Sequence, residues 1–344
     1  MTPHQIPDVP GLSDRPELPD LADLLATARV VSLPMKVRFR GVMQREVLLL
    51  EGPAGWAEFS PFLEYDDDEA SAWLAAAVEA GWRGFPAPVR DSVPVNATVP
   101  AVAPAEVPGV LARYDGAQTV KIKVAESGQY IDQDVARVAA VRAAAPHAAL
   151  RVDANGGWDV PVAVEALTRL AGYSLEYAEQ PVADIAGLRA VRTELRRRGI
   201  ATPIAADESV RKAADPLRVA REDAADLIVV KVQPLGGVRR ALEVVAQAGL
   251  PAVVSSALDS SVGIRAGVAL AAALPELPYA CGLATVSLMD ADVAAEPLVP
   301  AAGRLPVRDV VPDADLLDRL AAPEDRRQWW LERLTRTYRL LERT

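Results

Sequence analysis

Five short apolar segments, each ending near a charged residue, constrain the fold of this chain more than any other feature. The charged residues are Lys123, Asp153, Glu179, Asp207 and Lys231. The intervals between them are 30, 26, 28 and 24 residues, and a strand, a helix and two connections need about 30. Helical patterns fill the intervals. The spacing predicts parallel strands that close into a TIM-like barrel or form an open doubly wound sheet. In either fold the charged residues meet at one mouth.

Three of the five residues are carboxylates, and their predicted convergence requires positive charge between them. Neighbouring carboxylates repel one another and lose hydration unless they are paired. Oxygen ligands from three strands suit a hard divalent cation, so Mg²⁺ is predicted, with Mn²⁺ as the alternative. We therefore expect Asp153, Glu179 and Asp207 to bind the metal.

Lys123 and Lys231 lie on the strands that bracket these carboxylates in sequence. In a closed barrel, order along the chain becomes order around the barrel, so the two lysines would flank the metal from opposite sides. A lysine shielded from bulk water can act as a general base. This layout suits removal of a proton from carbon next to a carboxylate, because the resulting enediolate needs positive charge at its oxygens.

Taken together, these motifs resemble a known family. The sequences Lys121-x-Lys123, Asp153-x-Asn155, Glu179-Gln-Pro181, Asp207-Glu-Ser209 and the late Lys231 are similar to those of the muconate-lactonizing subgroup of the enolase superfamily. The likeness runs from about residue 33 to about residue 295. It implies a (β/α)7β barrel under an α+β capping domain. Arg151 and the segment 255–263 favour, within the subgroup, the Mg²⁺-dependent dehydratases of menaquinone synthesis.

For a dehydratase, the resemblance implies that Lys123 takes the proton and returns it to the departing hydroxyl. Lys231 would stabilise the anionic ring from the other face as a cation. The same five residues would also serve a racemase or epimerase of N-acylamino acids or dipeptides, in which both lysines act as bases in turn. A metal-binding scaffold without turnover is a third possibility, although binding alone needs no base.

Seven further residues are expected around the metal and the lysines: Lys121, Arg151, Asn155, Glu208, Ser255, Ser256 and Gly282. Side chains two apart on a strand share a face, so Lys121 and Arg151 would point inward and add positive charge around the carboxylates, whereas Glu176 alternates to the outside. Asn155 and Glu208 would hold the lysine or the ligands in position.

The last three of these residues would contact the substrate. The hydroxyls of Ser255 and Ser256, with the helix N-terminus that follows, suit an anionic group, although an ordinary helix cap is equally consistent. Gly282 would let the substrate approach the backbone.

The order of elements predicts three regions. Strands at 30–35, 43–51 and 55–59 and a helix at 67–81 form an N-terminal α+β capping domain, residues 1–94. Residues 95–296 form the barrel, with its first strand at 95–99 and its last at 279–283. Residues 297–344 would return to the capping domain. The link at 36–42 is shorter than the mobile loop common in the resembled family, which leaves the substrate contacts of the cap open.

Composition narrows the possible partners. The net charge of −10 argues against nucleic acid or an anionic membrane. The single cysteine and the absence of a signal peptide or long apolar run predict a cytoplasmic protein. Only two histidines are present, so catalysis by histidine or a His-ligated zinc site is disfavoured. We expect a small-molecule carboxylate substrate, and the sequence leaves the oligomeric state open.

Overall fold

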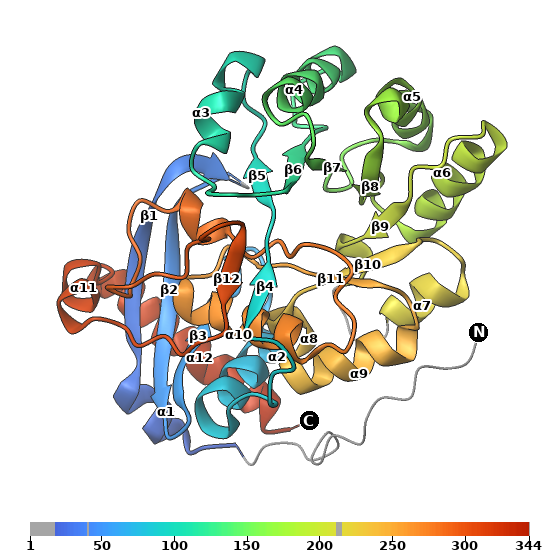
Figure 1. Cartoon of the computed structure of the whole chain (residues 1–344). Coiled ribbons are helices and arrows are strands. Elements are labelled where there is room, and N and C mark those ends of the chain that lie inside the picture. The colour runs from blue at the N-terminus through green and yellow to red at the C-terminus, as the bar shows by residue number, and fades with distance from the viewer. Residues whose placement is uncertain (1–17, 40, 211–214, 344) are drawn as a thin grey trace.

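The computed structural model describes residues 18–39, 41–210 and 215–343, and two sheets dominate it (Figure 1). The first is a three-stranded antiparallel sheet in the order β1-β2-β3. Its strands are β1 (Arg29–Phe39), β2 (Val42–Gly52) and β3 (Gly55–Phe59). Helix α1 (Leu21–Thr27) precedes this sheet, and helix α2 (Asp67–Val78) follows it and continues into a π-helical turn, Glu79–Arg83. The Asp66 side chain caps α2 by accepting a hydrogen bond from Glu69 N.

The second sheet has seven parallel strands in sequence order from β5 to β11. They are β5 (Ala97–Val99), β6 (Thr119–Lys123), β7 (Ala149–Asp153), β8 (Leu175–Glu179), β9 (Ile204–Ala206), β10 (Leu227–Val230) and β11 (Ala252–Val254). In place of a full eighth strand, Cys281 forms a parallel bridge to Val95, and Gly282 forms one to Ser255. These bridges join the two edges of the curled sheet, so the predicted barrel with an α+β cap is confirmed.

Helices connect successive barrel strands and lie outside the sheet (Figure 1). They are α3 (Val107–Leu111), α4 (Ile131–Ala144), α5 (Val160–Leu170), α6 (Ile185–Arg197), α7 (Asp215–Arg221), α8 (Val232–Leu235), α9 (Val238–Ala248) and α10 (Ser261–Ala273). Short 3₁₀ turns lie at Pro104–Glu106, Ala171–Tyr173, Glu208–Val210 and Thr285–Leu288. Within the described ranges, no helix has the length and apolar character needed to cross a membrane.

The C-terminal segment returns to the N-terminal part of the chain. Strand β12 (Arg304–Pro306) pairs with β4 (Ser92–Pro94), and α11 (Ala314–Arg319) leads to α12 (Glu324–Leu341). Trp330 of α12 is fully buried, with its ring edge-on to Phe59 at 6.0 Å between centroids, and its indole N–H donates to Glu46 at 2.8 Å. Arg333 donates to the main-chain oxygen of Tyr65 at 2.6 Å. The last helix therefore packs on the first sheet and on the segment that follows it.

Candidate active site

The three predicted carboxylates lie at the carboxyl ends of three neighbouring barrel strands. Asp153 ends β7, Glu179 ends β8, and Asp207 directly follows β9. In the parallel register, Lys123 pairs with Asp153, and Asp153 pairs with Glu179. All three carboxylates are buried. The βα spacing therefore brought these residues to one edge of the sheet, as predicted.

Three lysine side chains supply the positive charge that this row of carboxylates requires. Lys121 Nζ donates to Asp153 at 2.8 Å and to Glu179 at 2.9 Å, so one ammonium group bridges two carboxylates. Lys123 Nζ donates to the same Asp153 oxygen at 2.6 Å. At the other end of the row, Lys231 forms an ion pair with Asp207. Lys123 and Lys231 thus lie at opposite ends of the row.

Burial and charge act in opposite directions on these groups. Burial alone would raise the pKa of Asp153, but the charges of Lys121 and Lys123 outweigh it and hold that pKa well below its usual range. Glu179 shares one ammonium group with Asp153, so burial and the Asp153 charge raise the pKa of Glu179 to about 8. Although burial opposes it, the pKa of Asp207 is lowered by Lys231 and Lys121. Negative charge is therefore least well compensated at Glu179.

A divalent cation fits this donor set in its chemistry. Among the described residues, no three His, Cys, Asp or Glu side chains are arranged as they stand to hold a metal ion, and the Lys121 ammonium group lies between Asp153 and Glu179. The donors are nevertheless buried carboxylate oxygens from three strands, which a hard divalent cation prefers. Lys121 shows that two of them already converge on one positive charge.

Asn155 and Glu208 lie beside the lysines, where the sequence predicted them. Asn155 Oδ1 accepts a hydrogen bond from Lys123 at 2.6 Å, and Asn155 Nδ2 donates to Glu208 at 3.0 Å. Burial and the Asp207 charge raise the pKa of Glu208. The Asn155 side chain therefore links Lys123 to the segment that follows Asp207.

Gln180 is a site residue that the sequence analysis did not single out. Its side-chain oxygen accepts from Asp207 N at 2.9 Å and from Ser209 N at 3.2 Å. Its amide nitrogen donates to Val182 O and to Ser209 Oγ. The only signal was its place in the Glu-Gln-Pro motif. Gln180 fixes the main chain at Asp207 and so orients that carboxylate.

Arg151 points into the barrel as predicted, but it does not join the carboxylates at the mouth. Its Nε contacts Glu176 at 2.5 Å, and Nη1 donates to Ala280 O at 2.7 Å. The guanidinium packs over the ring of Tyr177 at 4.7 Å from the centroid. Leu150 pairs with Leu175 while Arg151 pairs with Tyr177, so Glu176 is an extra residue on β8 and lies beside Arg151. The contacts of Arg151 therefore lie with Glu176, Ala280 and Tyr177 rather than with the three carboxylates at the mouth.

Ser255, Ser256 and Gly282 contact one another rather than an open pocket. Ser256 Oγ donates to Gly282 O at 3.0 Å, and a Cβ on Gly282 would lie 2.6 Å from Ser255 Oγ. The missing side chain of Gly282 is thus required by the bridge to Ser255. The prediction that it makes room for a substrate lacks support in these contacts.

The N-terminus of the helix after these serines is already occupied. The Glu58 carboxylate, from β3, accepts hydrogen bonds from Ser260 N at 3.1 Å and Gly263 N at 3.0 Å. Glu58, a residue of the first sheet, therefore occupies the helix N-terminus at which we expected an anionic group of the substrate.

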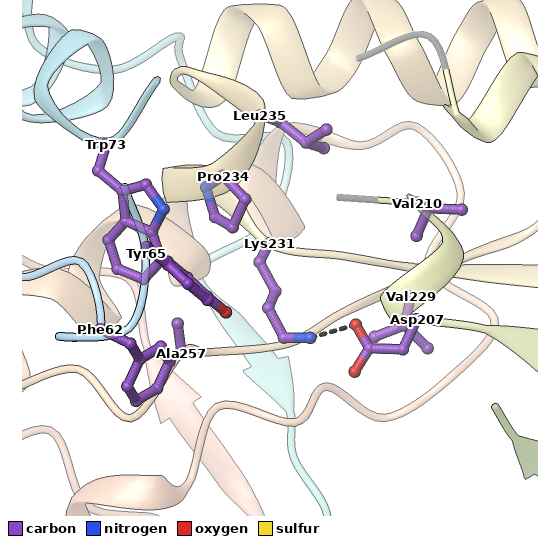
Figure 2. Close-up of a pocket in the computed structure, with 10 residues that line it drawn as sticks. All are labelled: Phe62, Tyr65, Trp73, Asp207, Val210, Val229, Lys231, Pro234, Leu235 and Ala257. Atoms are coloured by element: carbon purple, nitrogen blue, oxygen red, sulfur yellow. Dashed lines mark hydrogen bonds and ion pairs between the residues drawn. The ribbon is translucent and has the colours of Figure 1, made fainter. Parts of the chain in front are cut away.

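Aromatic residues from the N-terminal part of the chain form a wall that the sequence did not reveal. Figure 2 shows Phe62, Tyr65 and Trp73 across a pocket from Lys231 and Asp207. The enclosed cavity is about 20 Å³, close to the space of one water molecule. The Trp73 indole nitrogen is buried and has no hydrogen-bond partner among the described residues. The N-terminal unit therefore lies over the end of the barrel that carries the lysines.

Comparison with known proteins supports this architecture. The family described as "Enolase C-terminal domain-like" matches residues 109–312, and "Enolase N-terminal domain-like" matches residues 30–81. A muconate lactonizing enzyme from Pseudomonas fluorescens, solved with muconolactone, has a similar fold with a TM-score of 0.72. It is 22% identical, and the match covers 86% of this chain and 98% of that enzyme. The fold is that of the enolase superfamily.

Two relatives narrow the family further. The o-succinylbenzoate synthase of Mycolicibacterium smegmatis is 56% identical over 325 residues, which are 94% of this chain and 99% of the relative. The o-succinylbenzoate synthase of Mycobacterium tuberculosis is 55% identical over 327 residues, 95% of this chain and 98% of the relative. The chain belongs to the o-succinylbenzoate synthase family of the enolase superfamily.

Proposed function

We propose that this protein has o-succinylbenzoate synthase activity. It removes water from 2-succinyl-6-hydroxy-2,4-cyclohexadiene-1-carboxylate and forms 2-succinylbenzoate for menaquinone synthesis. The observation that carries the proposal is the pair of lysines, Lys123 and Lys231, at opposite ends of a row of three buried carboxylates. The high identity to named synthases over almost the whole chain supports the choice of reaction.

Enolase-superfamily sites combine a lysine or histidine base with a divalent cation. We infer that the cation here is Mg²⁺, with Mn²⁺ as the alternative, and that Asp153, Glu179 and Asp207 hold it. When bound, it withdraws negative charge from the substrate carboxylate and so makes the neighbouring C–H bond more acidic. Lys121, Lys123 and Lys231 form ion pairs with these carboxylates. Their ammonium groups therefore lie where positive charge is needed.

Lys123 is the proposed base. Its Nζ takes the proton from the ring carbon that bears the carboxylate, and the electrons of that C–H bond pass into the carboxylate to give an anionic enediolate. These electrons then return to form the new ring double bond as the C–O bond breaks. The same ammonium group then protonates the departing hydroxyl, so that water leaves and the ring becomes aromatic. Asn155 Oδ1, 2.6 Å from Nζ, holds the lysine for this transfer. Lys231 remains a cation on the other face and stabilises the anionic ring.

The region next to Lys231 suits the remainder of the substrate. Phe62, Tyr65 and Trp73 give the pocket an apolar wall, and the unpartnered Trp73 N–H offers a hydrogen bond to an acceptor. We retain residues 1–94 as a capping domain, 95–296 as the barrel and 297–344 as a segment that packs on the cap. The single buried cysteine and the water-soluble substrate support a cytoplasmic site of action.

The test is a dehydration assay on the purified protein. Incubation with the cyclohexadiene carboxylate and Mg²⁺ should produce 2-succinylbenzoate, a chelator should stop the reaction, and added Mg²⁺ should restore it. Deuterium exchange at the alpha carbon of an N-succinylamino acid, without dehydration, would identify a racemase instead. Inactivity on both substrates would favour a binding scaffold.

A further inference from the structure

We propose that Arg45 and Glu58 are positioning residues that clamp the segment between β11 and α10, here called the rim loop, residues 255–260. The clamp holds the rim loop in a strained conformation and thereby fixes the pocket wall that faces Lys231. This inference rests on the proposed function, because its readout is turnover at the same site. Neither residue belongs to the barrel, since Arg45 lies on β2 and Glu58 lies on β3.

Glu58 accepts four hydrogen bonds, and two of them come from Ser260 at the end of the rim loop. Its Oε2 accepts from Ser260 Oγ at 2.6 Å, from Ser260 N at 3.1 Å and from Gly263 N at 3.0 Å. Its Oε1 accepts from Ser60 Oγ at 2.6 Å. The carboxylate is buried, and a Cβ on Gly263 would lie 2.8 Å from Oε2. Glycine at this position therefore makes room for a carboxylate that comes from another part of the chain.

Arg45 holds the middle of the rim loop by its main-chain oxygens. Its Nε donates to Leu258 O at 3.1 Å, and its Nη2 donates to Ala257 O at 3.4 Å. Nη2 also donates to Ser60 Oγ at 3.1 Å, which places Arg45 and Glu58 in one network. The side chain is buried, so these contacts are shielded from water.

The conformation that the clamp holds is unfavourable for the residue that adopts it. Leu258 has a φ of 64°, in the left-handed region that residues with a Cβ avoid. Such a residue persists only where its surroundings fix it. On the loop itself, Asp259 Oδ2 accepts a hydrogen bond from Ala257 N at 3.0 Å. The Leu258 side chain is buried in the core, and Arg45, on the first sheet, holds the Leu258 main-chain oxygen.

The rim loop and the first turn of α10 each reach the region of the proposed site. Ala257 lines the pocket that contains Lys231 and Asp207 (Figure 2). Gln233, two residues after Lys231, donates to Gly263 O at 3.4 Å, beside the Glu58 carboxylate. If the clamp is lost, the strain at Leu258 is released by a movement of the loop, and the wall facing Lys231 moves with it. Small displacements of groups that position a substrate reduce turnover strongly.

The experiment compares Glu58→Ala with Glu58→Gln in the dehydration assay with Mg²⁺. Glutamine can accept the same three hydrogen bonds at one oxygen, so Glu58→Gln should keep kcat within about twofold. Glu58→Ala should lower kcat about 10- to 100-fold, and hydrogen–deuterium exchange should rise over residues 255–265. Arg45→Lys, which keeps the charge but loses the guanidinium contacts, provides a second test if Glu58→Ala does not fold.

A rescue experiment separates positioning from general damage. Leu258→Gly removes the cost of the left-handed conformation, whereas Leu258→Ala removes almost the same side-chain volume and keeps the cost. Added to Glu58→Ala, Leu258→Gly should restore most of kcat and Leu258→Ala should not. Equal rescue by both, or wild-type kcat in Glu58→Ala and Arg45→Lys, would refute the clamp. A wild-type protein without dehydratase activity would instead refute the proposed function, while the exchange measurement still tests the clamp.

Discussion

The barrel strands β6 to β8 carry two clusters of charged side chains, one at the mouth and one two or three residues deeper, and the two are stabilised differently. At the mouth, the Lys121 ammonium group is shared between Asp153 and Glu179, and the Lys123 ammonium group pairs with Asp153. At the floor of the barrel, Arg151 is held by the Glu176 carboxylate, a main-chain oxygen and the face of Tyr177. The Lys123 side chain is 12% exposed, whereas that of Arg151 is 0% exposed. The lysine ammonium groups at the mouth can exchange their carboxylate partners for a cation and a substrate. The Arg151 guanidinium at the floor instead stabilises the fold.

The largest effect should follow from removing the proposed base at the mouth. Lys123→Ala should reduce dehydration at least about 10²- to 10⁴-fold, because the same group acts as base and then as acid. Lys231→Arg keeps a cation and should retain part of the activity, although the shape of arginine differs. Steady-state assays measure both, and circular dichroism checks the fold. A Lys123→Ala protein that dehydrates the cyclohexadiene at nearly the wild-type rate would show that the base is misassigned.

A second comparison uses two carboxylates of the same strand. Glu179→Gln should weaken Mg²⁺ binding at least about tenfold, because a charged oxygen ligand becomes a neutral one. Glu176→Gln, three residues earlier but at the floor, should leave Mg²⁺ affinity unchanged. Isothermal titration calorimetry with Mg²⁺ alone measures both variants. Unchanged affinity in Glu179→Gln would remove it from the ligand set.

Substitution of Arg151, at the floor of the barrel, should lower the free energy of unfolding rather than kcat. Arg151→Met leaves Glu176 without its cation and removes the donor to Ala280 O and to Asn96 Oδ1, which should cost about 3–5 kcal/mol of unfolding free energy. Urea unfolding measures the loss, and kcat of the folded fraction should stay within about threefold of wild type. The double variant Arg151→Met with Glu176→Gln should recover part of the stability. Loss of kcat without loss of stability would place Arg151 in the active site after all.

The buried Glu58 carboxyl group can be compared with the carboxylates at the mouth, because no lysine ammonium group bridges it to another carboxylate. Burial, with the Asp259 charge, raises the pKa of Glu58 from 4.5 to about 7. The folded protein therefore binds this proton more tightly than the unfolded chain does. Below pH 4.5 the protonated Glu58 side chain makes its full contribution to stability. As the pH rises to about 7 this contribution is lost, and the free energy of unfolding falls by about 2–3 kcal/mol. Glu58→Gln cannot ionise and should not show this loss.

Unfolding free energies of the wild type and of Glu58→Gln, measured between pH 4 and 8, test this difference. Subtracting the two curves removes the titration of groups that both proteins share. Parallel curves would mean that Glu58 is ionised throughout this range in the folded protein, as the mouth carboxylate Asp153 is.

The sequence alone determined the series of parallel βα units and the row of charged residues at their shared mouth, while the choice of a barrel over an open sheet came from the family resemblance. Both follow from local arithmetic, because each βα unit has nearly constant length and parallel strands end at the same edge. That arithmetic placed Lys123, Asp153, Glu179, Asp207 and Lys231 together before any contact was known. Alternation along single strands also placed Lys121 beside the carboxylates.

Only the tertiary structure decided what lies around that row. A one-residue bulge at Glu176 gave Arg151 a partner at the floor, and strict alternation cannot anticipate a bulge. The aromatic wall of Phe62, Tyr65 and Trp73, and the Glu58 carboxylate at the N-terminus of α10, come from residues far away in the chain. Spacing within one segment carries no information about which distant segment will pack against it. Those neighbours are fixed only when the N-terminal unit packs over the barrel and buries its polar groups against hydrogen-bond partners.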